Sequence, residues 1–307
     1  MPHVHGLHHV TAITGDARGN LAFWRDVLGL RFVKKTVNFD DPSVYHLYYG
    51  DELGRPGSAM TFFAWEQMAP GSRGAGELAE TQLAVPAGAL DWWAQRLATA
   101  GCTTARETRL GEARLTFRDP DGLDLALVEA PDDDRVPWVG GTVPAEVAIR
   151  GFHGVTLALR DAAGTAAVLT AALDYAKRGA DGDVRRLEAP AGSAARFVDL
   201  AQTSAGPARP GAGSVHHVAF AVADRAAQDA VREKVLAAGL QVTPPIDRDY
   251  FHAIYFRAAG GVLFEVATDG PGFTVDEPAD RLGTSLKLPR RHEPRRAALE
   301  TTLPPLD

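Results

Sequence analysis

The chain has 307 residues, of which 45% are hydrophobic and 23% are charged, so it can hold one large domain or two of about 150 residues. A formal net charge of -7, with no basic block before the C-terminal tail, argues against a nucleic-acid partner, and no apolar run reaches membrane-spanning length. The single cysteine, Cys102, excludes an intrachain disulfide, and the N-terminus lacks signal-peptide features, so we expect a cytoplasmic enzyme or binding protein.

The N-terminal segment predicts four strands and one helix. A β-branched and apolar strand covers residues 7–13, and a helix then places Leu21, Trp24 and Leu28 on one face before Gly29 ends it. Three further strands follow, separated by turns that contain Pro or Gly, at residues 31–37, 44–49 and 58–63. The predicted order is therefore β-α-β-β-β.

This order recurs along the chain. Further copies begin near residues 80, 151 and 214, and the spacing from strand to helix end is similar in three copies. It runs from His9 to Gly29, from Gln82 to Gly101 and from His217 to Gly239. Repetition with a period of about 55 residues predicts an α+β fold of βαβββ modules, in which each sheet curls and carries its helices on the outer face.

Two segments lie outside this repeat. Residues 131–150 are rich in Asp, Pro and Gly and are typical of a linker. We therefore predict two halves, an N-terminal pair of modules at residues 1–140 and a C-terminal pair with a tail at residues 141–307. The tail after Gly270 is polar and contains a basic run at residues 290–296, which we interpret as a solvated C-terminal segment.

Metal-capable side chains lie in otherwise apolar strands. The sequence His-His-Val begins at His8 in the first copy and at His216 in the fourth, and Glu265 lies in the last strand of the fourth copy. A buried histidine or carboxylate is costly unless something pairs with it, so two histidines and this glutamate form a candidate metal site. Because neighbouring side chains of a strand alternate between faces, only one histidine of each pair can face inward. Alternation alone does not say which one.

The other copies act as an internal control. Gln82 in the second copy and Gly154 in the third take the position of His9, and Thr61 in the first takes the position of Glu265. Since only the first and fourth copies carry the ligands, we expect the metal between them, with the middle pair as scaffold. Two histidines and one carboxylate leave three positions of an octahedral metal open, which is typical of non-heme Fe(II) oxygenases, although Mn(II) or another divalent metal fits the same ligands.

Taken in order, these motifs resemble the vicinal oxygen chelate superfamily of glyoxalases, bleomycin-resistance proteins and dioxygenases. Within it, they are most similar to ring-cleaving dioxygenases of the hydroquinone type, and the similarity is carried by residues 7–11, 45–54, 248–251 and 260–265. The resemblance implies four βαβββ modules that form two curled mixed sheets. It also implies that His9, His217 and Glu265 bind Fe(II), and that the protein opens a hydroquinone or a related aromatic diol with O2.

The resemblance assigns roles to residues around the metal as well. It implies catalytic roles for Arg248, Tyr255 and His216 and substrate-binding roles for Thr11 and His8. An arginine can stabilise a phenolate, and a tyrosine can donate a hydrogen bond to a ring oxygen. From the residues alone, Arg248 also fits a surface salt bridge and Tyr255 a packed strand aromatic. Alternation puts His8 and His216 on the face opposite to the ligands, and we assign His46 to strand packing.

Two other functions stay open. A glyoxalase-like metal-dependent isomerase or lyase usually needs a further carboxylate ligand, and Thr61 at the place where it would lie counts against this function. A non-enzymatic protein that sequesters a small drug-like molecule has no need of His9, His217 and Glu265 together. As partners we expect a small aromatic substrate and O2, no nucleic acid and no membrane, and a homo-oligomer is also open.

Overall fold

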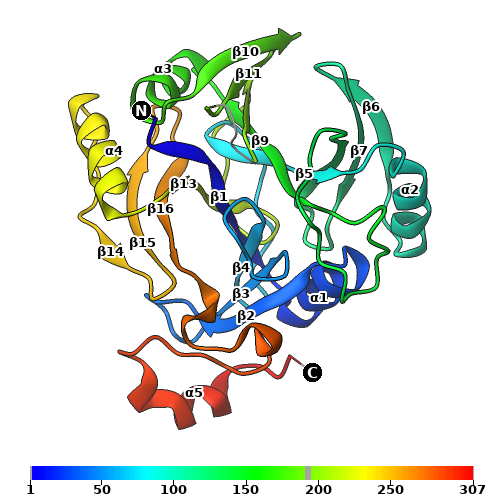
Figure 1. Ribbon diagram of the computed structural model, residues 1–307, viewed down its shortest axis with the longest axis vertical. Helices are drawn as coiled ribbons and strands as arrows, with labels where there is room; N and C mark the ends of the chain where they lie inside the picture. The colour runs from blue at the N-terminus through cyan, green and yellow to red at the C-terminus, as the bar shows by residue number, and fades with distance from the viewer. Residues whose placement is uncertain (1, 191–194, 307) are drawn as a thin grey trace.

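The computed structural model describes residues 2–190 and 195–306, and within these residues the strands form two mixed sheets of eight strands each (Figure 1). The βαβββ order occurs four times along the chain, so the predicted α+β fold of four modules in two curled sheets is confirmed. Among the described residues, no helix is both long enough and apolar enough to cross a membrane.

The first sheet joins the first module to the fourth. The first module contains, in chain order, β1 (Val4–Thr14), α1 (Ala17–Leu21), a π-helical turn (Ala22–Val27), β2 (Arg31–Val37), β3 (Tyr45–Gly50) and β4 (Ala59–Ala64). The fourth contains β13 (Val215–Val222), α4 (Arg225–Ala237), β14 (Ile246–Asp247), β15 (Phe251–Arg257) and β16 (Leu263–Pro271). The strand order is β14-β15-β16-β13-β1-β4-β3-β2, so the two modules meet where β1 runs antiparallel to β13.

The second sheet joins the second module to the third in the same way. The second module contains β5 (Glu77–Val85), α2 (Leu90–Thr99), β6 (Ala105–Arg109), β7 (Glu112–Arg118) and β8 (Asp124–Glu129). The third contains β9 (Gly151–Leu159), α3 (Ala162–Ala172), β10 (Ala176–Asp181), β11 (Val184–Glu188) and β12 (Phe197–Gln202). Their order, β10-β11-β12-β9-β5-β8-β7-β6, repeats that of the first sheet.

Aspartates start three of the helices. The side chains of Asp16, Asp161 and Asp224 accept hydrogen bonds from backbone N–H groups in the first turns of α1, α3 and α4. An N-cap of this kind satisfies donors that have no partner within the helix. Each helix then buries an apolar side, as α4 does with Val231 and Val235. Helices α2 and α4 lie on opposite outer sides of the molecule (Figure 1).

The C-terminal segment after β16 packs against the first sheet, so the prediction of a solvated tail is wrong for the segment as a whole and holds only for the largely exposed basic run at residues 290–296. It ends in helix α5 (Arg296–Thr302), whose Leu299 is buried. The side chain of Lys34 on β2 is fully buried, and its ammonium group pairs with Asp276 at 2.6 Å and Glu277 at 2.5 Å. A buried lysine requires such partners, so ion pairs as well as apolar contacts hold the segment on the sheet.

Residues 131–150 connect the second module to the third and contain no helix or strand. The first sheet combines the modules at the two ends of the chain, and the second combines the two middle modules. The division into halves at residues 1–140 and 141–307 stays a prediction, because the strand order does not show which parts fold independently.

Candidate metal centre

Three neighbouring strands of the first sheet bring the expected ligands together. The strands β16, β13 and β1 are adjacent and carry Glu265, His217 and His9. His9 Nε2 lies 3.2 Å from His217 Nε2, and Glu265 Oε2 lies 3.0 Å from His217 Nε2 and 3.4 Å from His9 Nε2. Within the described part of the chain, this is the one group of three His, Cys, Asp or Glu side chains whose ligand atoms lie close enough to share an ion.

The geometry of the three side chains fits a metal ion. Ligand atoms bound at about 2.1 Å and at right angles to one another are about 3.0 Å apart, which is close to the observed spacing. Glu265 is fully buried, and neither carboxylate oxygen has a hydrogen-bond partner of good geometry among the described residues. Burial raises the pKa of Glu265, but His9 and His217 outweigh this effect and hold that pKa well below its usual range. A fully buried carboxylate needs a positive partner, and an ion held between these three ligand atoms fits that need.

A β-bulge lies beside each ligand histidine. In the pairing of β1 with β13, His8 and His216 are the extra residues that have no partner on the opposite strand. A bulge interrupts the strict alternation of side chains. The Nδ1 of His8 therefore lies 2.9 Å from Nδ1 of His9, and the Nδ1 of His216 lies 2.8 Å from Nδ1 of His217. The expectation that His8 and His216 point away from the ligands is wrong.

These contacts determine which ring nitrogen of each ligand carries the proton. With Nε2 of His9 facing the centre, its Nδ1–H donates to His8, whose Nε2–H donates to the carbonyl of Thr268 at 3.2 Å. His217 donates to His216 in the same way. Burial lowers the pKa of His8 to about 3 and that of His216 to about 4, so both are neutral acceptors near neutral pH. Partners of this kind hold metal-binding imidazoles in one orientation.

Arg248 and Tyr255 lie beside the centre on the side of the fourth module. Tyr255 on β15 pairs with Glu265 across the strands, and its ring centre lies 5.9 Å from that of His217. Arg248 precedes β15 and donates from Nε to the Tyr255 hydroxyl at 3.2 Å. Burial raises the pKa of Tyr255, so its hydroxyl is a neutral donor. Both side chains line the cavity described below.

Thr11 contacts the centre only indirectly. Its hydroxyl lies 2.7 Å from that of Thr61, which lies 2.9 Å from Nε2 of His46. The Nδ1 of His46 accepts a hydrogen bond from the Tyr48 hydroxyl at 2.8 Å. Thr11 is therefore the inner end of a polar chain, and His46 and Tyr48 are the members that line the cavity.

A cavity of about 520 Å³ opens onto the three ligands. Its wall is largely aromatic and includes Phe39, His46, Tyr48, Phe63, Trp65, Phe251 and Tyr255. The prediction that His46 only packs within its strand did not foresee that its side chain lines this cavity. The period of two along β3, which places His46 and Tyr48 on one face, is the sequence signal that could have revealed it. Burial lowers the pKa of His46 well below its ordinary value, so it is a neutral hydrogen-bonding group.

The second sheet repeats the register of the first. The pairing of β5 with β9 shows the same two bulges as that of β1 with β13, and it places Glu80 at the position of His9. The pairing of β9 with β12 places Asp199 at the position of Glu265. The prediction that Gln82 corresponds to His9 is therefore wrong by two residues, because the bulges that align the modules cannot be seen in the sequence.

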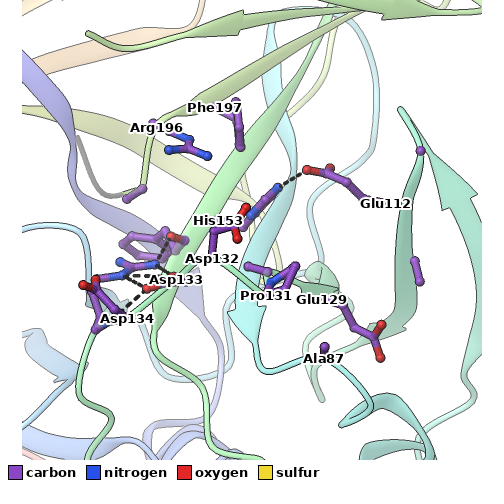
Figure 2. A pocket seen from close by; sticks show the side chains of 16 residues that line it. Ala87, Glu112, Glu129, Pro131, Asp132, Asp133, Asp134, His153, Arg196 and Phe197 are labelled. Atoms are coloured by element: carbon purple, nitrogen blue, oxygen red, sulfur yellow. Dashed lines mark hydrogen bonds and ion pairs between the residues drawn. The ribbon is translucent and has the colours of Figure 1, made fainter. Parts of the chain in front are cut away.

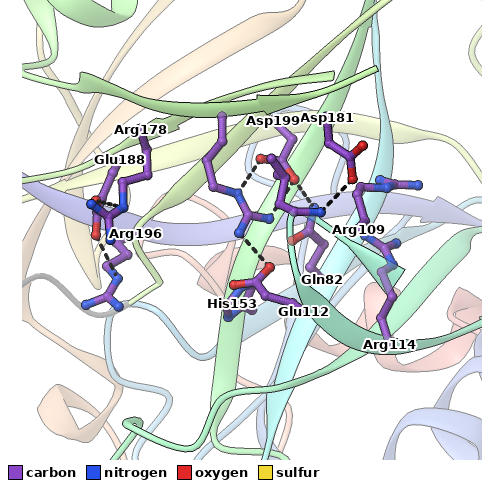
Figure 3. A network of polar contacts seen from close by, with 12 residues as sticks. Gln82, Arg109, Glu112, Arg114, His153, Arg178, Asp181, Glu188, Arg196 and Asp199 are labelled. Atoms are coloured by element: carbon purple, nitrogen blue, oxygen red, sulfur yellow. Dashed lines mark hydrogen bonds and ion pairs between the residues drawn. The ribbon is translucent and has the colours of Figure 1, made fainter. Parts of the chain in front are cut away.

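Arginines occupy the centre of the second sheet (Figure 3). Arg186 donates two hydrogen bonds to Asp199, at 2.7 and 2.9 Å, and a third to Glu112 at 2.5 Å. Arg114 forms an ion pair with Glu80. Each of these three carboxylates is bound by an arginine, so each has a positively charged partner without a metal ion.

A cavity of about 780 Å³ lies beside this network (Figure 2). His153 lines it at the position that corresponds to His216, and its Nε2 lies 3.0 Å from Glu112. The linker adds acidic side chains at residues 132–134. Since no metal-binding group is found here among the described residues, the first sheet holds the candidate centre.

The sequence profile of the Glyoxalase/Bleomycin resistance protein/Dioxygenase superfamily matches residues 6–127 and 123–266. The chain is 42% identical to MhqO of Bacillus subtilis (strain 168), named as an inferred ring-cleaving dioxygenase, over 98% of this chain and 96% of the relative. It is 38% identical to a chlorohydroquinone/hydroquinone 1,2-dioxygenase of Sphingobium indicum, over 93% of this chain and 91% of the relative. A crystal structure of an inferred dioxygenase from Bacillus subtilis is 41% identical, has a TM-score of 0.96 and covers 100% of this chain and 99% of that chain.

Proposed function

This chain belongs to the Glyoxalase/Bleomycin resistance protein/Dioxygenase superfamily, and on this premise we propose that it is a ring-cleaving dioxygenase that opens a hydroquinone or a related aromatic diol with O2. Relatives that match nearly the whole chain are named as ring-cleaving dioxygenases, and one is named for hydroquinone. The observation that carries the proposal is the convergence of His9, His217 and Glu265 at a cavity with aromatic walls.

We assign Fe(II) to the centre, with His9, His217 and Glu265 as its ligands. When bound there, Fe(II) supplies open positions at which a diol oxygen and O2 can bind side by side. The buried carboxylate without a hydrogen-bond donor supports a divalent cation, and the two-histidine, one-carboxylate donor set supports iron. Mn(II) or another divalent metal fits the same donors.

Arg248 and Tyr255 hold the substrate in this proposal. The guanidinium group and the phenol lie together at the cavity wall, so both can donate hydrogen bonds to an oxygen of the ionised diol. The fixed charge of Arg248 then stabilises the negative charge that the ring oxygen carries while the ring opens. Aromatic side chains around the cavity can pack against a single ring and exclude water.

The contacts of His8 and His216 support an orienting role. Each accepts a hydrogen bond from the ligand histidine that follows it, and His216 also lines the cavity. The catalytic role of His216 and the substrate-binding roles of His8 and Thr11 remain part of the proposal.

In the proposed reaction both oxygen atoms of O2 enter the product. The bond between an oxygen-bearing ring carbon and its neighbour breaks, one of these carbons becomes a carboxylic acid, and the other becomes a carbonyl group. The diol supplies the electrons, so no further reductant is needed.

A metal-dependent isomerase or lyase is the second candidate. The position in the first module that corresponds to Glu265 holds Thr61, which pairs with β1 in the same register. Its hydroxyl is already bonded to Thr11 and His46, and it offers no carboxylate to the centre. This observation favours the dioxygenase. A protein that only sequesters a ligand does not account for the convergence of His9, His217 and Glu265 on one point.

Anaerobic reconstitution with Fe(II), followed by O2 uptake, tests the function. Hydroquinone, catechol and the hemithioacetal of methylglyoxal are supplied in parallel. We expect O2 and hydroquinone to be consumed in equal amounts, with loss of the aromatic absorbance. Turnover of the hemithioacetal alone would support the isomerase, and tight binding of an aromatic ligand to metal-free protein without any turnover would support the sequestering protein.

A cytoplasmic location and a homo-oligomeric state stay predictions, as does the absence of nucleic-acid and membrane partners.

A further inference from the structure

The loop between β2 and β3 forms part of the wall of the metal-site cavity. Residues 38–41 of this loop all line the cavity, and Phe39 is 9% exposed. The loop is closed by its own hydrogen bonds, because Asn38 N donates to the carbonyl of Val44 at 2.8 Å and Asp40 N donates to Oδ1 of Asn38 at 2.9 Å. The position of this loop therefore sets the shape of the cavity beside the proposed substrate.

The basic run near the C-terminus binds this loop from outside. The Nε2–H of His292 donates to the carbonyl of Phe39 at 2.8 Å. The guanidinium group of Arg291 donates to the same carbonyl and, at 3.2 Å, to Oδ1 of Asp40. These bonds join a segment more than 250 residues away in sequence to the wall of the cavity.

Asp40 shares its carboxylate between this segment and the proposed active site. Its Oδ2 lies 3.3 Å from Nη1 of Arg248, while Oδ1 faces Arg291. The ring of Phe39 lies near both arginines, with its centre 5.4 Å from the guanidinium carbon of Arg248 and 5.8 Å from that of Arg291. Phe39 and Asp40 are thus in contact with both guanidinium groups.

Arg248 is consequently held at two edges of its guanidinium group. Its Nε is bonded to the Tyr255 hydroxyl and its Nη1 to Asp40. A single hydrogen bond would leave the plane of this long side chain free to rotate, whereas two partners in different directions fix it.

We propose that Asp40 is a positioning residue for Arg248, and that Arg291 and His292 of the C-terminal segment hold Asp40 and its loop in place. The inference rests on the proposed function, because it names a residue that orients the group that binds the substrate oxygen. The side chains of Asp40 and Arg291 are 70% and 54% exposed, so their ion pair contributes little to the free energy of unfolding. We therefore expect its loss to lower turnover and to leave stability nearly unchanged.

A set of variants tests the role of Asp40. Asp40→Ala is expected to lower kcat about tenfold with little change in thermal unfolding, and Asp40→Glu is expected to recover part of the loss. In the Arg248→Ala background, Asp40→Ala is expected to add less than about a twofold effect, because the residue that Asp40 orients is absent. Full additivity of the two substitutions, or unchanged turnover in Asp40→Ala, would overturn the proposal.

A second pair of variants tests the C-terminal segment without measuring activity. Arg291→Gln is expected to speed hydrogen exchange at residues 38–44. The matched control is Arg295→Gln, which removes the same charge from a side chain with no hydrogen bond or ion pair found among the described residues. Equal rates of hydrogen exchange at residues 38–44 in both variants would show that Arg291 does not hold this loop.

The two failures can be told apart. If wild-type protein loaded with Fe(II) opens no diol, the proposed function fails, and the hydrogen-exchange result still shows whether Arg291 holds the loop. If wild-type protein is active and the Asp40 variants are additive with Arg248→Ala, only the positioning role fails.

Discussion

The two sheets of the molecule share a strand order and a register, yet their buried centres are built in different ways. In the first sheet, Glu265 faces two histidines and has no hydrogen-bond donor of good geometry among the described residues. In the second sheet, Asp199 stands at the same position and accepts two hydrogen bonds from Arg186 and one from Gln82.

Two buried arginines account for this difference. The strand pairings place Arg186 at the position of Tyr255, and Arg114 at the position of His46. Their side chains are only 4% and 1% exposed. Where the first sheet has a phenol and an imidazole, the second therefore has two permanent positive charges.

The comparison shows how one module can serve as scaffold or as site. Any buried carboxylate needs a positive partner. An arginine meets this need with a forked pair of hydrogen bonds, one to each oxygen, and offers no open coordination position to a substrate. A metal ion meets it and keeps further positions open. We therefore expect chemistry from the first sheet and stability from the second.

Removing a ligand from the first sheet should give the largest effect. His9→Ala is expected to lose the metal and at least about 1000-fold of O2-dependent ring opening, because the ion supplies several kcal/mol of stabilisation in the transition state. The fold should persist, since each module keeps its core. Metal analysis and circular dichroism check this, and full iron occupancy with full activity would remove His9 from the centre.

Matched substitutions at the shared position sharpen the comparison. Asp199→Asn is expected to cost about 3–5 kcal/mol of unfolding free energy, because it leaves the charge of buried Arg186 without its main partner, and to leave the metal content unchanged. Glu265→Gln is expected to do the reverse, with metal lost and metal-free stability nearly unchanged. Denaturant unfolding and metal analysis of both variants are the measurements. If Asp199→Asn also lost the metal, the two centres would not be independent.

A smaller effect is expected beside the metal. Arg248→Ala should keep the metal and lower turnover on the order of 100-fold, because it removes one fixed charge that faces the substrate oxygen. Arg196→Ala removes an exposed arginine that directly precedes β12; this variant is the control and should keep full turnover. Unchanged turnover in Arg248→Ala would leave Arg248 as a surface ion-pair residue.

The smallest effect concerns acid stability and belongs to the second sheet. Burial raises the pKa of Glu112, but His153 and Arg186 outweigh it and hold that pKa below its ordinary 4.5. The carboxylate therefore stabilises the folded chain above the unfolded-state pKa, and this contribution is lost as the pH falls through the folded-state pKa.

The wild-type protein is expected to lose unfolding free energy between about pH 5 and about pH 3 as Glu112 takes up a proton. We expect Glu112→Gln to lose roughly 1 kcal/mol less over the same range. The exposed Glu146→Gln is the control and should leave the pH dependence as in wild type. If the unfolding free energy of Glu112→Gln and of wild type changed with pH in parallel, the Glu112 carboxylate would contribute nothing to the acid dependence of stability.

The sequence by itself determined the modules and the chemistry of the ligands. Gly101 and Gly239 end their helices with φ of 80° and 78°, a conformation that favours glycine, so the distance from strand to glycine marks each module. Histidine and glutamate in apolar strands also indicate a buried site from residue type alone. The sequence predicts the metal between the first and fourth modules because only they carry these side chains.

Only the tertiary structure decided how those side chains face one another. The orientation of His8 and His216, and the match of Glu80 with His9, depend on bulges in two pairings between distant strands. The docking of the C-terminal segment likewise depends on the buried charge of Lys34. Alternation fixes the face of a side chain only within an uninterrupted strand. Each bulge shifts it by one residue, at a place set by a partner strand far away in the sequence.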